Sequence, residues 1–357
     1  MNYANSNDKF GSGNDSFLDS YKANFTSTAQ TFNFTRISEI YWLSGGLAEY
    51  GTEQATNGVA PYSKHGFFTS PELSNRDIVP SERGTLTISY DKNVVNDAGT
   101  QVTVFKYTDV GGRGMWQRVP GTVNTSKHTV TVPFDEFGYY AVYKLNRSFS
   151  DVTNHPWARN ILNALYSKGI MEYLRADAFG ADDQTTRGEF ATLLVKGLSL
   201  PINASDSQQS FFDVPYGSKT ITWDYEHLET AARAGIITGK IEGFFSPNLP
   251  ITRQEAAVMI ARAAKLKLDI NNDKLSQKLA KTYLDSGKIE YYARPAVQAV
   301  SSAKIMSGSP VTLQGAKKAS FNFNPTSNMT RAEAAKIAIE LFKKNKSTKN
   351  MFPKNFN

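Results

Sequence analysis

Hydrophobic and polar residues alternate along much of the first 147 positions, with the two-residue period of β-strands. Strands are predicted at residues 31–34, 86–90, 102–104, 130–132 and 138–143. Residues rich in Gly, Asn and Ser separate these runs and predict turns. Short strands joined by turns are typical of an antiparallel β-sandwich. We therefore expect an antiparallel β-sandwich over residues 29–147, preceded by a linker over residues 1–28.

From Phe149 onward the apolar positions follow a helical period, and the sequence repeats itself in three blocks. Each block opens with an aromatic residue and an Asp, continues through a second aromatic residue and a turn, and reaches Thr-Arg-x-Glu before an alanine-rich stripe. One block cannot cover its own apolar face, and small residues allow close approach. We therefore expect an α+β chain in which an all-α, pseudo-threefold helical prism follows the β-sandwich. The predicted modules are 149–203, 208–268 and 280–344, and a basic tail at 345–357 follows them.

The Thr-Arg-x-Glu motif predicts a capping box at the start of a helix, with Thr at the N-cap and Glu at N3. The capping residues are Thr186, Glu189, Thr252, Glu255, Thr330 and Glu333. The opening Asp of each block is expected to cap or bracket the shorter helix that carries the block's second aromatic residue. These aspartates are Asp151, Asp213 and Asp285, and the aromatic residues are Trp157, Trp223 and Tyr292.

The motif arginine stands at the first helical position, where capping requires no particular side chain and where a cation opposes the helix dipole. It is nevertheless present in all three blocks, as Arg187, Arg253 and Arg331. A cation beside unpaired N-terminal amides suits a carboxylate or phosphate. Alternatively, each arginine pairs with an acidic residue of its own or a neighbouring block and locks the blocks together. The aromatic residues are likewise either sugar-stacking platforms or core residues, and their position in a helix favours the core.

Composition narrows the function classes. The chain has 357 residues with no Cys and four His, which excludes disulfides and thiolate chemistry and leaves little for a His-based metal site. No catalytic residue, metal or cofactor is expected. No stretch is long and apolar enough for a membrane helix, and the amino terminus predicts no signal peptide.

The positive charge of the chain is unevenly distributed. Residues 1–148 hold 13 Lys and Arg against 14 Asp and Glu, and residues 149–357 hold 27 Lys and Arg against 19 Asp and Glu, so the net charge of +7 arises in the second half. That charge favours an anionic partner.

The three blocks resemble S-layer homology (SLH) modules over about residues 149–342. The resemblance implies a pseudo-threefold SLH prism that binds anionic secondary cell-wall polymer in inter-module grooves, often through a terminal pyruvylated N-acetylmannosamine. It implies that the motif arginines face outward and contact the ketal carboxylate. We rank Arg253 first as a ligand contact, then Arg331, then Arg187. The resemblance also implies that Gly239, Ser307 and Gly308 let the polymer approach the backbone.

Two departures from the family pattern bear on these grooves. In the first block, Tyr173 replaces the turn Gly and Phe179-Gly180-Ala181 lacks the Pro of the other two blocks, so its groove is expected to be altered. The third block carries an insertion from Pro310 to Lys318. Residues 80–147 also resemble the β segment that often precedes SLH triplets in Gram-positive surface proteins.

The resulting hypothesis is a non-enzymatic, non-covalent cell-wall anchor, extracellular and forming a piece of a longer exported protein. Self-assembly into a surface layer is an additional expectation. The alternative is a wall-tethered enzyme acting on polysaccharide or peptidoglycan, with its site among the acidic residues between Glu39 and Glu82. A nucleic-acid partner is not expected, because the basic residues are interspersed with acidic ones.

Overall fold

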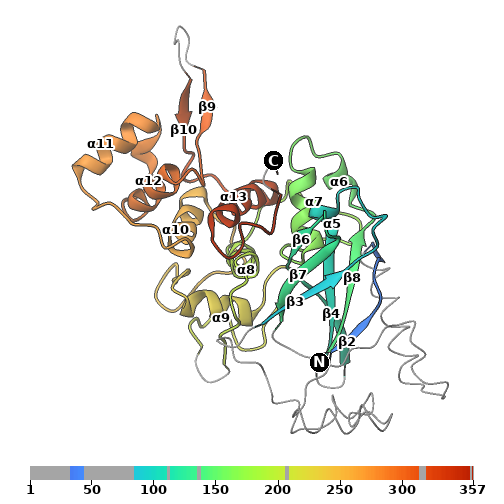
Figure 1. The fold of residues 1–357 in the computed structure, drawn as a ribbon. Coiled ribbons are helices and arrows are strands. Elements are labelled where there is room, and N and C mark those ends of the chain that lie inside the picture. The colour runs from blue at the N-terminus through green and yellow to red at the C-terminus, as the bar shows by residue number, and fades with distance from the viewer. Residues whose placement is uncertain are drawn as a thin grey trace, which may run out of the picture. The chain divides into compact units, whose positions relative to one another are not determined.

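A computed structural model describes residues 33–43, 84–110, 113–134, 138–205, 209–312, 319–353 and 356 (Figure 1). The predicted linker over residues 1–28 and all of the acidic candidates for an enzyme site except Glu39 lie outside these residues. The chain divides into two compact units, residues 1–148 with 167–169 and residues 149–166 with 170–357. We call the first the β half and the second the helical half.

The β half contains two antiparallel sheets. The larger has the order β1-β8-β4-β5 with β2 also paired to β8, and the smaller has the order β3-β7-β6. The strands are β1 (Phe34–Arg36), β2 (Tyr41–Leu43), β3 (Gly84–Ser89), β4 (Val102–Val110), β5 (Arg113–Val119), β6 (Thr122–Asn124), β7 (Thr129–Phe134) and β8 (Gly138–Leu145), and a short helix α5 (Ala98–Gln101) precedes β4.

The alternation in sequence matches the alternation in burial. Along β7, Val130, Val132 and Phe134 are buried while the residues between them are partly exposed. They share one apolar core with Val104 of β4 and Val142 of β8, so side chains from both sheets meet. The predicted antiparallel β class of this half is therefore confirmed.

The helical half repeats a helix pair in each block, α7 with α8, α9 with α10, and α12 with α13 (Figure 1). Its elements are α6 (Ser150–Thr153), α7 (Arg159–Ser167), α8 (Arg187–Gly197), α9 (Tyr225–Arg233), α10 (Arg253–Ala263), α11 (Asp273–Thr282), the 3-10 turns η2 (Ser286–Lys288) and η3 (Tyr291–Ala293), α12 (Arg294–Ser302), β9 (Ser309–Val311), β10 (Ser320–Asn322) and α13 (Arg331–Lys344). The insertion in the third block begins within β9 and ends just before β10, and this antiparallel strand pair projects from the helical half in Figure 1.

The second helix of each pair begins at the Thr-Arg motif, as predicted. Thr252 and Thr330 each form a complete capping box with the Glu three residues on. In the first block, Thr186 accepts from the Glu189 amide, but the Glu189 carboxylate accepts from the Thr185 hydroxyl at 3.0 Å instead of completing the box. The reciprocal half of this box was therefore predicted wrongly, because the carboxylate is drawn to other donors.

The start of each of these helices is hydrogen-bonded to the next block. The Arg187 amide donates to Leu249 O at 2.9 Å and the Arg253 amide to Ser327 O at 3.0 Å. The Arg331 amide donates to Asp183 O at 2.9 Å, which leads from the third block back to the first. The contacts therefore run in cyclic order, first to second to third to first.

The opening aspartates do not bracket the shorter helices, contrary to expectation. Asp151 accepts from the amides of Phe179, Gly180 and Ala181 at 2.7–3.1 Å. Asp213 holds the Phe245 loop and Asp285 holds the Phe323 loop in the same way. A carboxylate can accept hydrogen bonds from backbone amides that have no partner within a helix. The loops just before each Thr-Arg motif present such amides.

The C-terminal tail, predicted only as a basic segment because of its lysines, also contains buried apolar residues. Phe352 stacks on Phe342 of α13 with ring centroids 6.2 Å apart, and Met351 and Phe356 are buried as well.

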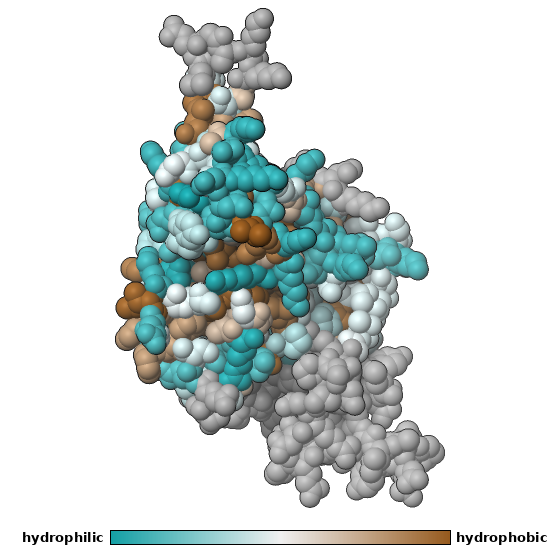
Figure 2. All heavy atoms as spheres, turned by 90° about the vertical axis from the view of Figure 1, so that its left-hand side faces the viewer, coloured by the Kyte–Doolittle hydropathy of each residue, from teal (hydrophilic) through white to brown (hydrophobic). Residues whose placement is uncertain are grey.

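The face of the molecule seen in Figure 2 is mainly hydrophilic, with apolar groups gathered near its middle. Across the described residues, no helix is long and apolar enough to cross a membrane.

Candidate functional site at the module junctions

Three junctions of one design join the blocks of the helical half. Each brings together the motif arginine of one block, the capping glutamate of the next, and the second aromatic residue of the third. We name each junction after its arginine. They are the Arg187 junction with Glu255 and Tyr292, the Arg253 junction with Glu333 and Trp157, and the Arg331 junction with Glu189 and Trp223.

Each motif arginine is fixed on a phenylalanine of the next block. Its guanidinium donates to the backbone carbonyl of that residue and lies 4.4–5.3 Å from the centre of the ring, a cation–π distance. The pairs are Arg187 with Phe245, Arg253 with Phe323, and Arg331 with Phe179. Because an Asp holds the amide of the same phenylalanine, the loop is fixed from both sides.

The expectation of three outward-facing guanidinium groups was wrong. Arg187, Arg253 and Arg331 are only 4%, 9% and 0% exposed. Burial lowers the pKa of Arg187 and Arg253, against the raising effect of nearby acidic groups. The arginine side chain is long enough to cross the junction and reach carbonyls that would otherwise be unsatisfied. The alternative interpretation, in which each arginine pairs with an acidic residue and locks the blocks together, therefore holds for Arg187 and Arg331, whereas Arg253 contacts the next block through backbone carbonyls alone.

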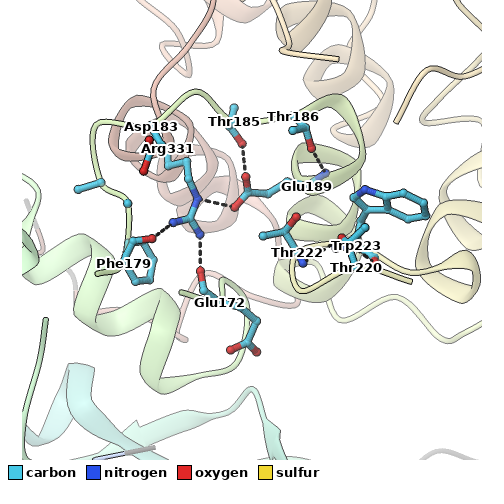
Figure 3. Close-up of polar contacts among 12 residues, drawn as sticks. Glu172, Phe179, Asp183, Thr185, Thr186, Glu189, Thr220, Thr222, Trp223 and Arg331 are labelled. Atoms are coloured by element: carbon cyan, nitrogen blue, oxygen red, sulfur yellow. Dashed lines mark hydrogen bonds and ion pairs between the residues drawn. The ribbon is translucent and has the colours of Figure 1, made fainter. Parts of the chain in front are cut away.

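The Arg331 junction is closed (Figure 3). Arg331 Nε contacts Glu189 Oε1 at 2.7 Å, and its two terminal nitrogens donate to the carbonyls of Phe179 and Glu172. Trp223 is only 6% exposed, and its indole nitrogen donates to Asn248 at 2.9 Å. All three nitrogens of the guanidinium are thus used inside the protein, and the aromatic residue is a core residue.

The Arg187 junction also has an internal carboxylate. Glu255 Oε1 lies 3.2 Å from Arg187 Nη1 and 3.4 Å from Lys240 Nζ. Tyr292 is 53% exposed beside this pair. Burial, together with the charges of Glu255 and Glu290, raises the pKa of Tyr292 to about 12. The guanidinium charge is therefore already balanced here, as at the Arg331 junction.

The Arg253 junction differs in having no such partner. Arg253 donates from Nε to Phe323 O at 2.8 Å and from Nη2 to Ser307 O at 2.9 Å. Among the described residues, no carboxylate lies within 4 Å of this guanidinium, and Nη1 has no hydrogen-bond partner. Glu333 accepts instead from the Thr330 amide at 3.0 Å, within its capping box.

A pocket of about 770 Å³ opens beside Arg253. Trp157, which is 43% exposed, forms part of its wall, and the β9–β10 pair contributes Pro310 and Phe321. Lys336 Nζ lies 5.1 Å from the centre of the Trp157 ring. A pocket with a partly apolar lining, a cation at its wall and an exposed indole is suited to an anionic, partly apolar ligand such as an acidic sugar.

Comparison with known families agrees with this internal repeat. The family model described as "S-layer homology domain" matches residues 148–191, 218–257 and 282–335. Residues 148–335 therefore contain a tandem of three S-layer homology domains. SLH domains anchor surface proteins to the cell wall, and they indicate a cell-surface or cell-wall location.

Relatives of the chain are both surface-layer proteins and glycosidases. S-layer protein EA1 of Bacillus anthracis is 27% identical over 191 residues, 54% of this chain and 20% of its own length. An endoglucanase of Bacillus sp. (strain KSM-635) is 30% identical over 193 residues, 54% of this chain and 18% of its own length. An amylopullulanase of Thermoanaerobacterium thermosulfurigenes is 26% identical over 332 residues, 93% of this chain and 16% of its own length. The chain thus spans a fifth or less of each of these relatives, and the third match extends into the β half.

The pocket of the SLH tandem collects four of the predicted ligand residues, Arg253, Trp157, Ser307 and Gly308. The other five do not line it. They are Arg187, Arg331, Trp223, Tyr292 and Gly239.

The glycines of the SLH turns are required by the chain's own packing. A Cβ on Gly308 would come within 2.8 Å of Asn322 O, and one on Gly239 would come within 2.4 Å of Ile241 O. Glycine is needed at both positions because another backbone segment lies against it.

Among the described residues, no group of three or more His, Asp or Glu is placed to hold a metal ion.

Proposed function

We propose that this protein is held on the bacterial cell wall by an acidic secondary polymer that binds in the Arg253 junction. One observation supports this choice. At the other two junctions a glutamate lies within 3.2 Å of the guanidinium, and at this one a pocket lies beside it instead. A ligand carboxylate at Arg253 would take the place that Glu189 and Glu255 occupy elsewhere.

Within this proposal, the ligand group is the carboxylate of a terminal pyruvylated N-acetylmannosamine. Its carboxylate would accept from Nη1 of Arg253 in a charge-assisted hydrogen bond. Its ring would pack against the exposed part of Trp157, as apolar sugar faces do on aromatic side chains. The cyclic contacts between the blocks support a closed, pseudo-threefold prism as the frame that holds these groups in place.

The test is sedimentation of the full chain with purified cell walls, before and after hydrofluoric acid has removed the secondary polymer. We expect binding only to untreated walls, and loss of that binding in Arg253→Gln. Lys267→Ala removes one positive charge from an exposed residue outside the pocket and should bind as the wild type does. Equal binding to stripped walls, or full binding by a folded Arg253→Gln variant, would overturn the proposal.

We further propose that the β half is a non-catalytic spacer or display module. Two of the relatives are named as glycosidases, but the stretch that matches this chain is only 16–18% of each. Incubation of the full chain with peptidoglycan and plant polysaccharides should release no reducing sugar. Release of reducing sugar would support the alternative of a wall-tethered enzyme. Self-assembly into a surface layer stays a prediction.

A further inference from the structure

Two lysines of the Arg253 pocket are peculiar to the third SLH domain. Lys304 and Lys336 both line the pocket and are both exposed. Among the described residues, neither ammonium group has a carboxylate within 4 Å, whereas Lys343, about two turns after Lys336 in α13, pairs with Glu340 at 3.1 Å. Two carboxylates also line the pocket, but Glu333 accepts within its capping box and Glu340 pairs with Lys343, so neither forms an ion pair with Lys304 or Lys336.

Lys304 occupies a position where the other two blocks have glycine. It precedes Ile305 as Gly169 precedes Ile170 and Gly235 precedes Ile236. The backbone there is left-handed in all three blocks, with φ of 54° at Lys304 and 69° at both glycines. A non-glycine residue is less favourable than glycine in this region of backbone conformation. The lysine side chain is thus present at a position that favours glycine.

Lys336 has no charged equivalent in the other two helices. It stands five residues after the motif arginine of α13, where α10 has Val258 and α8 has Thr192. Its ammonium lies 5.1 Å from the centre of the Trp157 ring. A cation–π contact at an exposed site is weak, so an anionic ligand can draw the ammonium away from the ring at small cost.

We propose that Lys304 and Lys336 form a second anion subsite in this pocket, which therefore selects a glycan segment with two acidic groups, one at Arg253 and one at the lysine pair. This inference rests on the proposed function, because it assigns a second role within the same pocket. At about 770 Å³ the pocket is toward the upper end of the roughly 300–1,000 Å³ found for small-molecule sites, and has room for more than one sugar ring.

The experiment compares two probes by isothermal titration of the full chain. One probe is the methyl glycoside of pyruvylated N-acetylmannosamine, which carries one acidic group, and the other is the acidic polymer released from purified walls. The variant is Lys304→Gly with Lys336→Gln, which restores the sibling glycine and keeps a long polar side chain near Trp157. Lys344→Ala with Lys349→Ala is the control, because it removes the same charge from exposed residues outside the pocket.

We expect the pocket variant to lose about tenfold in affinity for the polymer, as two exposed ion pairs would contribute. Its affinity for the monosaccharide should fall by no more than about threefold, and the control should match the wild type with both probes. The variant should unfold at no lower a urea concentration than the wild type, since the strain at position 304 is relieved. Equal losses for both probes, or unchanged polymer affinity, would overturn the second subsite while leaving the proposed function intact. Failure of the wild type to bind either probe would instead contradict the proposed function.

Discussion

The Arg331 and Arg253 junctions are built from the same motif, but the first is closed by an ion pair and the second opens onto a pocket. At Arg331, the carboxylate of Glu189 in the next block does not complete its capping box and instead contacts the guanidinium, and Trp223 is buried beside Gly188. At Arg253, the equivalent Glu333 stays in its capping box and a pocket opens beside the exposed Trp157. A repeated arginine can therefore stabilise the protein at one junction and remain available to a ligand at another, depending on where one carboxylate points.

The largest expected difference between the two junctions is in stability. Arg331→Ala would leave Glu189 buried without its partner, and breaking a buried ion pair costs about 3–5 kcal/mol. Arg253→Ala would leave only neutral carbonyls unsatisfied, at a cost of about 1–3 kcal/mol. Urea unfolding followed by circular dichroism at 222 nm, which reports mainly on the helical half, would compare them. Equal losses would mean that the carboxylate does not distinguish these junctions.

The aromatic residues should separate the junctions in the same direction. Trp223→Ala removes a buried indole and its hydrogen bond to Asn248, and we expect a loss of about 3 kcal/mol. Trp157→Ala removes a half-exposed side chain and should cost less than about 1 kcal/mol, while weakening wall binding. Both effects can be measured by urea unfolding together with cell-wall sedimentation. A Trp157→Ala variant that is as unstable as Trp223→Ala would show that Trp157 is a core residue.

A smaller loss is expected where α8 and α13 approach each other. A Cβ on Gly197 would lie 1.9 Å from the Phe342 ring, so Gly197→Ala forces the ring to move and should cost about 1–3 kcal/mol. Gly287 has nothing within 4 Å of such a Cβ, and Gly287→Ala is the control, expected within about 0.5 kcal/mol of the wild type. The melting temperatures of the two variants should differ accordingly. Matching temperatures would mean that the two helices separate easily.

The smallest expected effect is a pH dependence in the loop that faces Arg331. Burial opposes ionisation of Asp151, but its backbone hydrogen bonds outweigh burial and hold its pKa below the usual 3.8. A carboxyl whose pKa is lowered by folding adds stability above its unfolded pKa, and that stability is lost as the pH falls through the folded pKa. Asp151→Asn should therefore be less stable than the wild type at pH 7 and lose less stability between pH 5 and pH 3. A parallel loss in both proteins would exclude this role.

Local contacts were predictable from the sequence, and contacts between blocks were not. The boxes of Thr252 and Thr330 join residues three positions apart, so the motif itself specifies them. Asp151 binds amides 28–30 positions away, and Arg331 binds a carboxylate 142 positions away. The choice between outward and inward arginines depended on those distant partners.

Two further features could have been found in the sequence and were missed. Lys304 stands where the aligned blocks have Gly169 and Gly235, and a repeat alignment exposes that difference directly. The helix α11 begins at the N-cap Asn272 and buries Leu275 and Leu279 at helical spacing. The second feature escaped notice because it lies between two repeats rather than within one.

The number of ligands bound per chain tests the central claim most directly. Titration of the full chain with the methyl glycoside of pyruvylated N-acetylmannosamine should give one site, and Arg253→Gln should abolish it while the protein remains folded by circular dichroism. Three equivalent sites per chain, or a single site that persists in Arg253→Gln, would contradict the assignment of ligand binding to the Arg253 junction.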